Sequence, residues 1–339
     1  MAANLYVHFP FCRSRCSYCA LYSRVGATPA DRAFYVAGIA YDIIKTIPSH
    51  SPQTLKPSGP QTLSTVYFGG GSPAICDLRP LKSALAPLLG EETEFTVELH
   101  PLDVTPAKLD ELKSIGVNRI SMGVQSLDDD ILRAMGRGYT AAEAARAFAL
   151  VKSRFDNAGI DLIVGYPGER FDAPFPIADS RVSHLTSHVP PSFSSLRSWG
   201  LTHCSVYSLQ NERGLKDVPD DDVVLDRIHA VADFLKALGL ERYEISNYAL
   251  PGFECRHNLA VWRGEDYFGL GDGAYGRVGL KRTRGTGNGE REKKIIRLQN
   301  NRGAPCRGPQ GEDPFPAANE GWTQRVALPR MGTRPRRIR

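Results

Sequence analysis

The sequence predicts an α/β fold whose core is a partial (β/α)6 TIM-like barrel with a small, incomplete C-terminal extension. Six short runs with strand character are separated by helix-like segments, and this alternation indicates repeated βαβ units around a parallel sheet. Cysteine, glycine and polar residues follow several of these runs, where a barrel of this kind carries its chemistry. The 339 residues are 42% hydrophobic and 23% charged, which fits a globular chain with a sizeable core.

The six predicted strands are short runs rich in β-branched and aromatic residues. In chain order they are LYVHF (5–9), TVYF (65–68), FTVEL (95–99), RISMGV (119–124), DLIVGY (161–166) and HCSVYSL (203–209). At the C-terminal ends of these strands we expect the chemically distinctive residues, which are the first cysteines, GGGSP (69–73), Glu98, Gln125 and Asp161.

Four helices are expected between the strands. The first begins at Pro29, a residue favoured in the first turn of a helix, and runs to about Ile47. The others are LRPLKSALAPLL (78–89), TPAKLDELKSIG (105–116) and TAAEAARAFALVKS (140–153), and the last two open on a threonine suited to cap the N-terminus. Residues 48–64 and 171–200 are rich in Pro and Ser without clear periodicity, so we interpret them as irregular connections.

Charge divides the chain unevenly. Residues 281–339 contain 15 Lys and Arg against 5 Asp and Glu, a net charge of +10, whereas residues 1–280 carry 27 against 32, a net charge of −5. We therefore expect a barrel domain at 1–240, a C-terminal segment at 241–280 and a basic tail at 281–339 that is disordered or unrelated to the rest. A basic tail could bind nucleic acid or anionic lipid, but nucleic-acid binding is not expected to be the main function.

Cysteine usage and the N-terminus both indicate a cytoplasmic protein. No run approaches the length of a membrane span, and MAANLYVHFPF has no basic region ahead of an apolar stretch, so no secretory signal is expected. The seven cysteines are odd in number, with three crowded and four scattered: Cys12, Cys16, Cys19, Cys76, Cys204, Cys255 and Cys306. This distribution argues against a disulfide framework and favours a metal site.

The three crowded cysteines form Cys-x-x-x-Cys-x-x-Cys directly after the first strand. A structural zinc site would close its tetrahedron with four protein ligands, and no fourth ligand stands nearby. A [4Fe–4S] cluster held by three thiolates, with one iron left open for a small ligand, suits the spacing better. A zinc site and three incidental cysteines are the alternatives.

This motif resembles that of the radical S-adenosylmethionine (SAM) enzymes, in which the open iron chelates the amino and carboxylate groups of SAM. Other stretches are similar to the coproporphyrinogen-oxidase-like branch and, within it, to the HemW-type heme chaperones. In order, these are YVHFPFC, YFGGGSP, the Glu of VELHP, SMGVQS, MGRGYT, DLIVGYPGE, YEISNYA, PGFECRHNLAVW and GLGDGA, covering about residues 4–280. The resemblance is weak at 171–200 and ends at the tail.

The resemblance implies a [4Fe–4S] cluster on Cys12, Cys16 and Cys19 with SAM bound beside it. It implies that Gly70, Gly71 and Ser72 lie along SAM and receive its methionine amino end, and that Glu98 hydrogen-bonds the ribose. The other residues that it places near SAM or a second SAM are Tyr6, Tyr18, Gln125, Arg137 and Asp161. Each could instead be an ordinary surface or capping residue, and Gly69-x-Gly71-x-x-Ala74 also formally matches a dinucleotide-binding GxGxxA.

His257 opens the HNxxxW sequence HNLAVW. A lone histidine is more often structural than a ligand, but the HemW resemblance implies that this imidazole is an axial ligand of heme. Trp262 and Phe268 could cover a flat macrocycle. Position 261 is Val where the family has Tyr, which puts the neighbouring packing in doubt.

Two features distinguish the chaperones from the decarboxylases of the same branch. The oxygen-independent coproporphyrinogen III oxidases carry a further cysteine two residues after the third, where this chain has Leu21, and they have a longer segment before the cluster. Other positions depart from both groups, since Tyr139 and Tyr275 replace family histidines.

Three hypotheses follow from the resemblance. The leading one is a HemW-like chaperone that binds heme and transfers it to heme-dependent proteins, with a homodimer and SAM cleavage both left open. The alternative is a coproporphyrinogen III oxidase that uses SAM for oxidative decarboxylation in porphyrin biosynthesis. The third is a destabilised paralogue that keeps the cluster loop and exposes an apolar patch where a C-terminal domain would pack.

Overall fold

The computed structural model describes residues 4–47, 62–171, 175–176, 186–187 and 191–278, and all of them belong to one compact unit spanning residues 1–300. The predicted tail at 281–339, most of the predicted connection at 48–64, and residues 172–174, 177–185 and 188–190 of the predicted connection at 171–200 lie outside the described residues.

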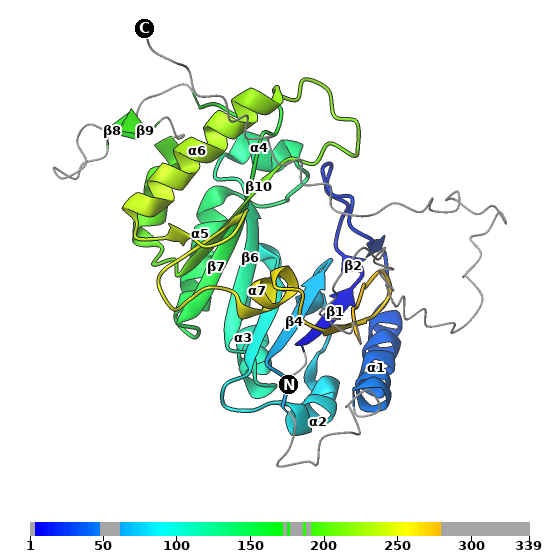
Figure 1. Cartoon of the computed structure of the whole chain (residues 1–339). Coiled ribbons are helices and arrows are strands. Elements are labelled where there is room, and N and C mark those ends of the chain that lie inside the picture. Colours follow the sequence, from blue (N-terminus) through cyan, green and yellow to red (C-terminus); the bar gives the residue numbers. More distant parts are fainter. Residues whose placement is uncertain (1–3, 48–61, 172–174, 177–185, 188–190, 279–339) are drawn as a thin grey trace, which may run out of the picture. The chain divides into compact units, whose positions relative to one another are not determined.

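A single nine-stranded sheet organises the fold, in the order β11-β12-β10-β7-β6-β5-β4-β1-β13 (Figure 1). Its strands are β1 (Asn4–Phe9), β4 (Thr65–Gly70), β5 (Glu94–Leu99), β6 (Arg119–Gln125), β7 (Asn157–Val164), β10 (His203–Ser208), β11 (Glu241–Arg242), β12 (Asn247–Ala249) and β13 (Tyr267–Leu270). The short strands β2 (Phe11–Cys12) and β3 (Arg24–Val25) pair with each other, as do β8 (Phe175–Pro176) and β9 (Thr186–Ser187).

The six predicted strands are confirmed as β1, β4, β5, β6, β7 and β10, which pair in parallel in chain order. The segment after residue 240 joins the same sheet at both edges. There β12 pairs antiparallel with β10, and β13 pairs parallel with β1. These pairings confirm the predicted α/β class with a mostly parallel sheet.

The helices are α1 (Pro29–Thr46), α2 (Lys82–Leu85), α3 (Pro106–Ser114), α4 (Asp129–Ala134), α5 (Ala141–Lys152), α6 (Asp221–Ala237) and α7 (Arg256–Trp262). Short 3-10 turns cover η2 (Pro73–Ile75), η3 (Arg79–Leu81), η4 (Ala86–Leu88), η5 (Pro101–Asp103) and η6 (Pro191–Ser198). Thr105 and Thr140 cap α3 and α5 as predicted. The single helix predicted at 78–89 is wrong, because Pro80 and Pro87 divide it into η3, α2 and η4.

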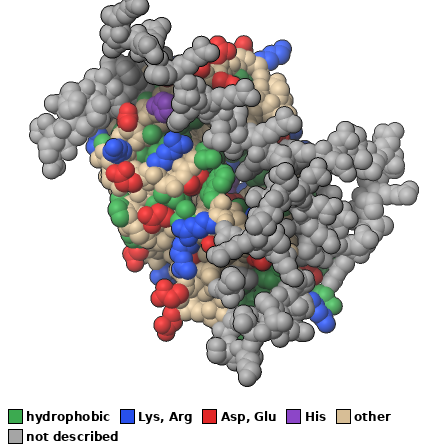
Figure 2. Space-filling view, in the orientation of Figure 1, with side chains coloured by type: hydrophobic (Ala, Val, Ile, Leu, Met, Phe, Trp, Pro, Cys, Tyr) green, Lys and Arg blue, Asp and Glu red, His purple; other side chains and the backbone are tan. Residues whose placement is uncertain are grey.

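The hydrophobic core lies on one side of the sheet, under the helices. Val7, Phe68, Val97, Ile120 and Ile160 are fully buried there. On the molecular face shown in Figure 2, acidic and basic side chains are interspersed and hydrophobic side chains form small separate groups. Within the described part of the chain, no helix combines the length and apolarity needed to cross a membrane.

Candidate functional site

A polar face on the sheet, opposite the hydrophobic core, carries most of the candidate site. Because side chains alternate along a strand, Tyr6 and His8 of β1 point away from their buried neighbours Leu5, Val7 and Phe9. Hydrogen bonds join further members across neighbouring strands: the Tyr67 hydroxyl donates to Glu98 Oε1 at 2.8 Å, and Ser121 Oγ donates to Asp161 Oδ1 at 3.0 Å. We use "polar face" for Tyr6, His8, Tyr67, Glu98, Ser121 and Asp161.

Beyond the C-terminal end of β1, Cys12 ends β2, and Cys16 and Cys19 lie in the loop between β2 and β3. This cysteine loop, residues 12–24, is fixed by contacts with distant segments. Ser17 N donates to Met135 O at 3.1 Å, the Ser17 and Tyr166 hydroxyls are 2.8 Å apart, and Arg213 Nε donates to Cys19 O at 3.0 Å. The protein fold therefore holds the loop in place from several sides.

Arg137 connects the cysteine loop to the end of β6. Its guanidinium is buried and donates to Gly123 O at 2.6 Å through Nη2, and to Cys16 Sγ and Tyr18 Oη, each at 3.4 Å, through Nη1. Nε donates to the Tyr139 hydroxyl at 2.8 Å. This arrangement places a permanent positive charge against the cysteine loop, where it would stabilise thiolates.

Burial favours the protonated form of two of the three thiols, Cys12 and Cys19. Burial, aided by the neighbouring thiols, raises the pKa of Cys12 to about 11, and burial also raises the pKa of Cys19. The described residues contain no three His, Cys, Asp or Glu side chains arranged to hold one metal ion. A [4Fe–4S] cluster has a different requirement, because each thiolate binds its own iron and deprotonation accompanies binding. The donor set of this loop fits a cluster better than a mononuclear zinc.

The glycines after β4 leave room for the cysteine loop and for β1. A Cβ at Gly71 would lie 2.5 Å from Phe11 O and 2.9 Å from Cys12 Sγ, and a Cβ at Gly70 would lie 2.6 Å from the His8 ring. Gly70 also has φ +106°, which disfavours any other residue. The backbone of Gly70 and Gly71 therefore lies close against His8, Phe11 and Cys12, and the role of these glycines along SAM stays a prediction.

The side chain of Ser72 is fixed by the buried carboxylate of Asp103. Its hydroxyl donates to Asp103, which also accepts a hydrogen bond from Arg13 Nε at 2.5 Å. The backbone N–H of Ser72 donates to Phe11 O at 2.7 Å, and that of Gly71 to Phe9 O at 2.7 Å. Both backbone donors are therefore used within the fold.

Beside Arg13 and Asp103 lies a cleft of about 600 Å³ on the outer side of the cysteine loop. Residues from the start of α1, the η2 turn and α3 complete its lining, including Arg32, Cys76 and Lys108. Lys108 Nζ contacts Glu111 at 2.8 Å, so most of the lining charge is neutralised locally.

Glu98 occupies the centre of the polar face. Its Oε1 accepts from Tyr67 Oη and its Oε2 accepts from Gly70 N at 3.1 Å. Burial and the nearby charge of Asp161 raise the pKa of Glu98 to about 7, and burial likewise raises the pKa of Asp161. Glu98 is half-buried, and both of its carboxylate oxygens accept hydrogen bonds within this network. Asp161 was expected at a strand end but lies within β7, since β7 begins four residues earlier at Asn157.

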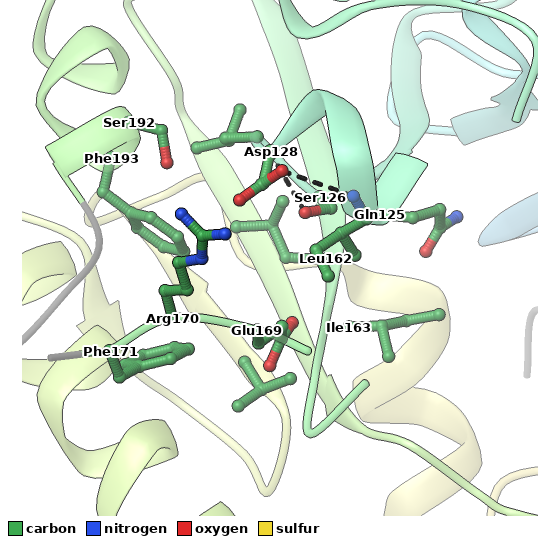
Figure 3. A pocket seen from close by; sticks show the side chains of 13 residues that line it. Gln125, Ser126, Asp128, Leu162, Ile163, Glu169, Arg170, Phe171, Ser192 and Phe193 are labelled. Atoms are coloured by element: carbon green, nitrogen blue, oxygen red, sulfur yellow. Dashed lines mark hydrogen bonds between the residues drawn. The ribbon is translucent and has the colours of Figure 1, made fainter. Parts of the chain in front are cut away.

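Gln125 ends β6 with an unusual backbone. Its φ is +70°, at a point where the pairing register between β6 and β7 shifts. It borders a small pocket of about 20 Å³ that Glu169, Arg170, Phe171, Ser192 and Phe193 line from the other side (Figure 3). In Figure 3 the Gln125 amide points away from those residues. A non-glycine residue held in this conformation stores backbone strain, a feature that clusters at binding sites.

His257 lies at the opposite end of the sheet from the cysteines. It belongs to α7 and contacts the first residue of β4, with Nδ1 2.7 Å from Thr65 Oγ1. Only 4% of its surface is exposed, and its ring packs 5.1 Å from the Tyr67 ring centroid. Burial and the charge of Arg119 lower the pKa of His257 to about 4, so the imidazole is neutral.

Glu94, the first residue of β5, fixes α7 in this position. Its carboxylate accepts from Arg256 N at 2.9 Å and from His257 N at 3.0 Å, and Cys255 Sγ lies 3.6 Å from Oε1. A carboxylate at this end of a helix satisfies free backbone donors and complements the helix dipole.

The predicted residues lie at two places, and His257 borders one of them, with its ring centroid 6.4 Å from that of Tyr6. Tyr6, Glu98 and Asp161 share the polar face, and Tyr18 and Arg137 meet at the cysteine loop. His8 was not predicted as a site residue; its Nε2 donates to Tyr22 O at 2.8 Å and its Nδ1 accepts from Tyr6 Oη at 3.0 Å. The alternation in YVHFP could have found it, because residues 6 and 8 of one strand face the same way.

Comparisons with known proteins agree with this geometry. The family model of the radical SAM superfamily matches residues 6–175. The chain is 31% identical over 298 residues to the heme chaperone HemW of Bacillus subtilis, covering 83% of this chain and 72% of that protein. It is 29% identical over 304 residues to the mouse mitochondrial radical S-adenosyl methionine domain-containing protein 1, covering 88% of this chain and 65% of that protein.

Among solved structures, coproporphyrinogen III oxidase (HemN) of Escherichia coli superimposes with a TM-score of 0.64 at 20% identity. The match covers 82% of this chain and 65% of that one, so this chain spans less than two thirds of the length of HemN and of the mouse protein. The likeness confirms the partial barrel predicted from the sequence.

Proposed function

Because this chain belongs to the radical SAM superfamily, in its HemN-like branch, we propose that it is a heme chaperone that carries a SAM-bound [4Fe–4S] cluster and passes heme to heme-dependent proteins. The observation that carries the proposal is the 31–32% identity to proteins named HemW from Bacillus subtilis, Lactococcus lactis and Mycobacterium tuberculosis. Leu21, 56% exposed, stands where decarboxylases of the branch have another cysteine, which supports the same choice. A cytoplasmic location goes with the proposal.

In this proposal Cys12, Cys16 and Cys19 hold the cluster and the wall from Gly70 to Ser72 holds SAM. A [4Fe–4S] cluster with an open iron supplies a binding point for the amino and carboxylate groups of SAM and can pass one electron to it. Arg137 keeps positive charge beside Cys16, and Gly71 leaves the space that the Cys12 sulfur needs. Glu98 offers its remaining lone pairs to the ribose hydroxyls.

Heme binding by His257 would require α7 to move. The imidazole is buried, and its Nδ1 is hydrogen-bonded to Thr65 Oγ1. A flat macrocycle therefore cannot reach it while α7 packs on β4 and β5. The exposed hydrophobic residues of α7 are Val261 and Trp262, 39% and 51% exposed, and heme could first contact the helix there.

The test combines heme binding with SAM cleavage. The cluster is reconstituted anaerobically, heme is titrated by absorbance into the wild type and His257→Ala, and the same samples are assayed for 5′-deoxyadenosine with coproporphyrinogen III present. We expect saturable heme binding that the substitution weakens at least tenfold, without substrate-dependent cleavage of SAM. Substrate-dependent 5′-deoxyadenosine with a decarboxylated product would instead identify an oxidase, and a reconstituted protein that binds no heme would rule out the chaperone.

A further inference from the structure

Arg119, the first residue of β6, is a buried cation whose hydrogen bonding is incomplete. Only 1% of its surface is exposed. It points to the same side of the sheet as Ser121 of the polar face, because residues two apart in a strand face the same way. Nη1 lies 3.5 Å from Thr96 Oγ1, whereas Nε and Nη2 have no hydrogen-bond partner among the described residues. Unpaired donors on a buried charge are strongly unfavourable, which points to an acceptor that binds there.

The groups that interact electrostatically with Arg119 already have other hydrogen-bond partners. Glu94 is one of them, but both of its carboxylate oxygens accept from the start of α7. Tyr67 is another, and its hydroxyl donates to Glu98. The acceptor for the free edge of Arg119 is therefore not supplied by these neighbours.

His203 of β10 is a second buried group with a free nitrogen on this side of the sheet. Ser205, two residues on, hydrogen-bonds to Asp161 of the polar face, and His203 itself is 1% exposed. Burial and the charge of Arg119 lower the pKa of His203, so its imidazole is neutral. The Tyr243 hydroxyl accepts from the backbone N–H that precedes α7 at 3.1 Å and donates to His203 Nε2 at 2.7 Å. Nδ1 then carries the ring proton, and it has no partner among the described residues.

The free edge of Arg119 is suited to a carboxylate. Nε and Nη2 lie on one edge of the planar guanidinium, and their spacing matches the two oxygens of a carboxylate. One guanidinium beside a neutral imidazole balances a single negative charge. A phosphate would bring a second charge toward the buried carboxyl groups of Glu98 and Asp161, which also interact electrostatically with Arg119.

Helix α7 covers this end of the polar face (Figure 1). The His257 ring packs 5.1 Å from the Tyr67 ring centroid, and the charge of Arg119 contributes, after burial, to its lowered pKa. His257 and Arg119 therefore face the same buried region. The movement of α7 that heme binding by His257 requires would also uncover the free edge of Arg119.

We propose that Arg119, with His203 beside it, binds a carboxylate of the ligand that enters when α7 moves. In a form that rests on the proposed function, this carboxylate is a propionate of the heme whose iron His257 binds. A single iron–imidazole bond leaves the macrocycle free to rotate about that bond. An ion pair at the edge of the macrocycle fixes one orientation.

The test compares heme with its dimethyl ester, in which both propionates are neutral. Each is titrated by absorbance into the full chain with its cluster reconstituted. We expect the wild type to bind heme about tenfold or more tightly than the ester. In Arg119→Gln, which removes the charge, the two affinities should agree within about twofold, and the ester should bind as it does to the wild type. His203→Phe should reduce the preference for heme by a smaller factor.

Arg263→Gln is the matched control, because Arg263 is an exposed cation directly after α7. It should keep the wild-type preference for heme over the ester. A preference that persists in Arg119→Gln, or one that disappears in Arg263→Gln, overturns the proposal. The comparison within the wild type needs no variant, so equal affinities for heme and ester overturn it even if Arg119→Gln does not fold.

Coproporphyrin III and its tetramethyl ester, titrated by fluorescence, separate this site from the chaperone function. A wild type that binds no heme but prefers coproporphyrin III to its ester, with the preference lost in Arg119→Gln, keeps the carboxylate site and rules out the chaperone. A wild type that binds heme and its ester equally keeps the chaperone and rules out the site. Binding of neither tetrapyrrole overturns both.

Discussion

Arg137 donates a hydrogen bond to Cys16 Sγ at 3.4 Å while the same guanidinium holds Gly123 O at 2.6 Å. The charge that faces the cysteine loop is therefore fixed to the barrel itself rather than to a flexible surface side chain. This contact has a direct consequence for how strongly the loop retains a cluster.

Replacing Arg137 is expected to speed cluster loss. Arg137→Gln removes the positive charge beside the thiolates, and hydrogen bonds to charged groups contribute about 1.5–3 kcal/mol each. Release of iron to a chelator, followed by absorbance, should be at least tenfold faster than in the wild type. The matched control is Arg133→Gln, whose side chain is 75% exposed on α4. Equal release rates for Arg137→Gln and wild type would show that the contact is not used.

Adding a methyl group at Gly71 is expected to prevent cluster assembly. The new Cβ would lie 2.5 Å from Phe11 O and 2.9 Å from Cys12 Sγ, so the wall or the cysteine loop must shift. Iron and sulfide analysis of reconstituted Gly71→Ala should give less than half of the wild-type content. Gly38→Ala, which meets no neighbour, should load normally. A wild-type iron and sulfide content in Gly71→Ala would mean that the cysteine loop shifts to accommodate the methyl group and still assembles the cluster.

Glu98 is expected to make stability depend on pH. Its pKa rises from an ordinary 4.5 to about 7 in the folded state, so the folded protein holds this proton more tightly than the unfolded chain does. Stability is therefore greatest below pH 4.5 as far as this group is concerned, and it is lost as pH rises toward 7, by on the order of 2–3 kcal/mol.

Urea unfolding of the metal-free protein at several pH values measures this effect. Because Glu169 has a similarly raised pKa, the informative quantity is the difference in unfolding free energy between the wild type and Glu98→Gln. Between pH 4.5 and 7 the unfolding free energy of the wild type should fall relative to that of Glu98→Gln. A difference that does not change with pH would mean that the pKa of Glu98 is not raised in the folded protein.

Weakening the hold of Glu94 on α7 is expected to expose His257. Glu94→Gln loses the charge that accepts from Arg256 N and His257 N, which should destabilise α7 by about 1–3 kcal/mol. If His257 is the heme ligand, stopped-flow absorbance should show faster heme association than in the wild type. Glu91→Gln, an exposed carboxylate just before β5, is the control. An unchanged rate would mean that heme binds without movement of α7.

Strand periodicity and turn residues were sufficient to predict the barrel strands. The runs predicted at 5–9, 65–68, 95–99 and 119–124 correspond to β1, β4, β5 and β6 of the sheet. They were recognisable because β-branched and aromatic residues fit a pleated buried surface. The helix at 78–89 failed, since its apolar spacing was helical while Pro80 and Pro87 broke the backbone hydrogen bonds. The position of α7 could not be predicted either, because it depends on contacts with Glu94 that are 162 and 163 residues away in sequence.

Some residues of the candidate site could be predicted from local sequence, and others depend on the tertiary fold. Cys12, Cys16 and Cys19 were recognisable because their spacing is local, and Glu98 was recognisable because a carboxylate interrupts an apolar strand. His8 was missed because its partner, the carbonyl of Tyr22, becomes a neighbour only when the cysteine loop folds back on β1. The burial of His257 is likewise a tertiary property that no local pattern contains.

The order β13-β1-β4 has a consequence for the sequence of events during translation. Asn4 Nδ2 donates to Asp266 O at 3.0 Å across 262 residues, so β1 has a partner on only one side until the ribosome has made β13. The cysteines thus emerge long before β13, and until then their loop is attached to a strand that lacks one of its two neighbours. The three thiols are therefore accessible to the machinery that supplies iron and sulfur for a long part of synthesis. This period ends when β13 pairs with β1.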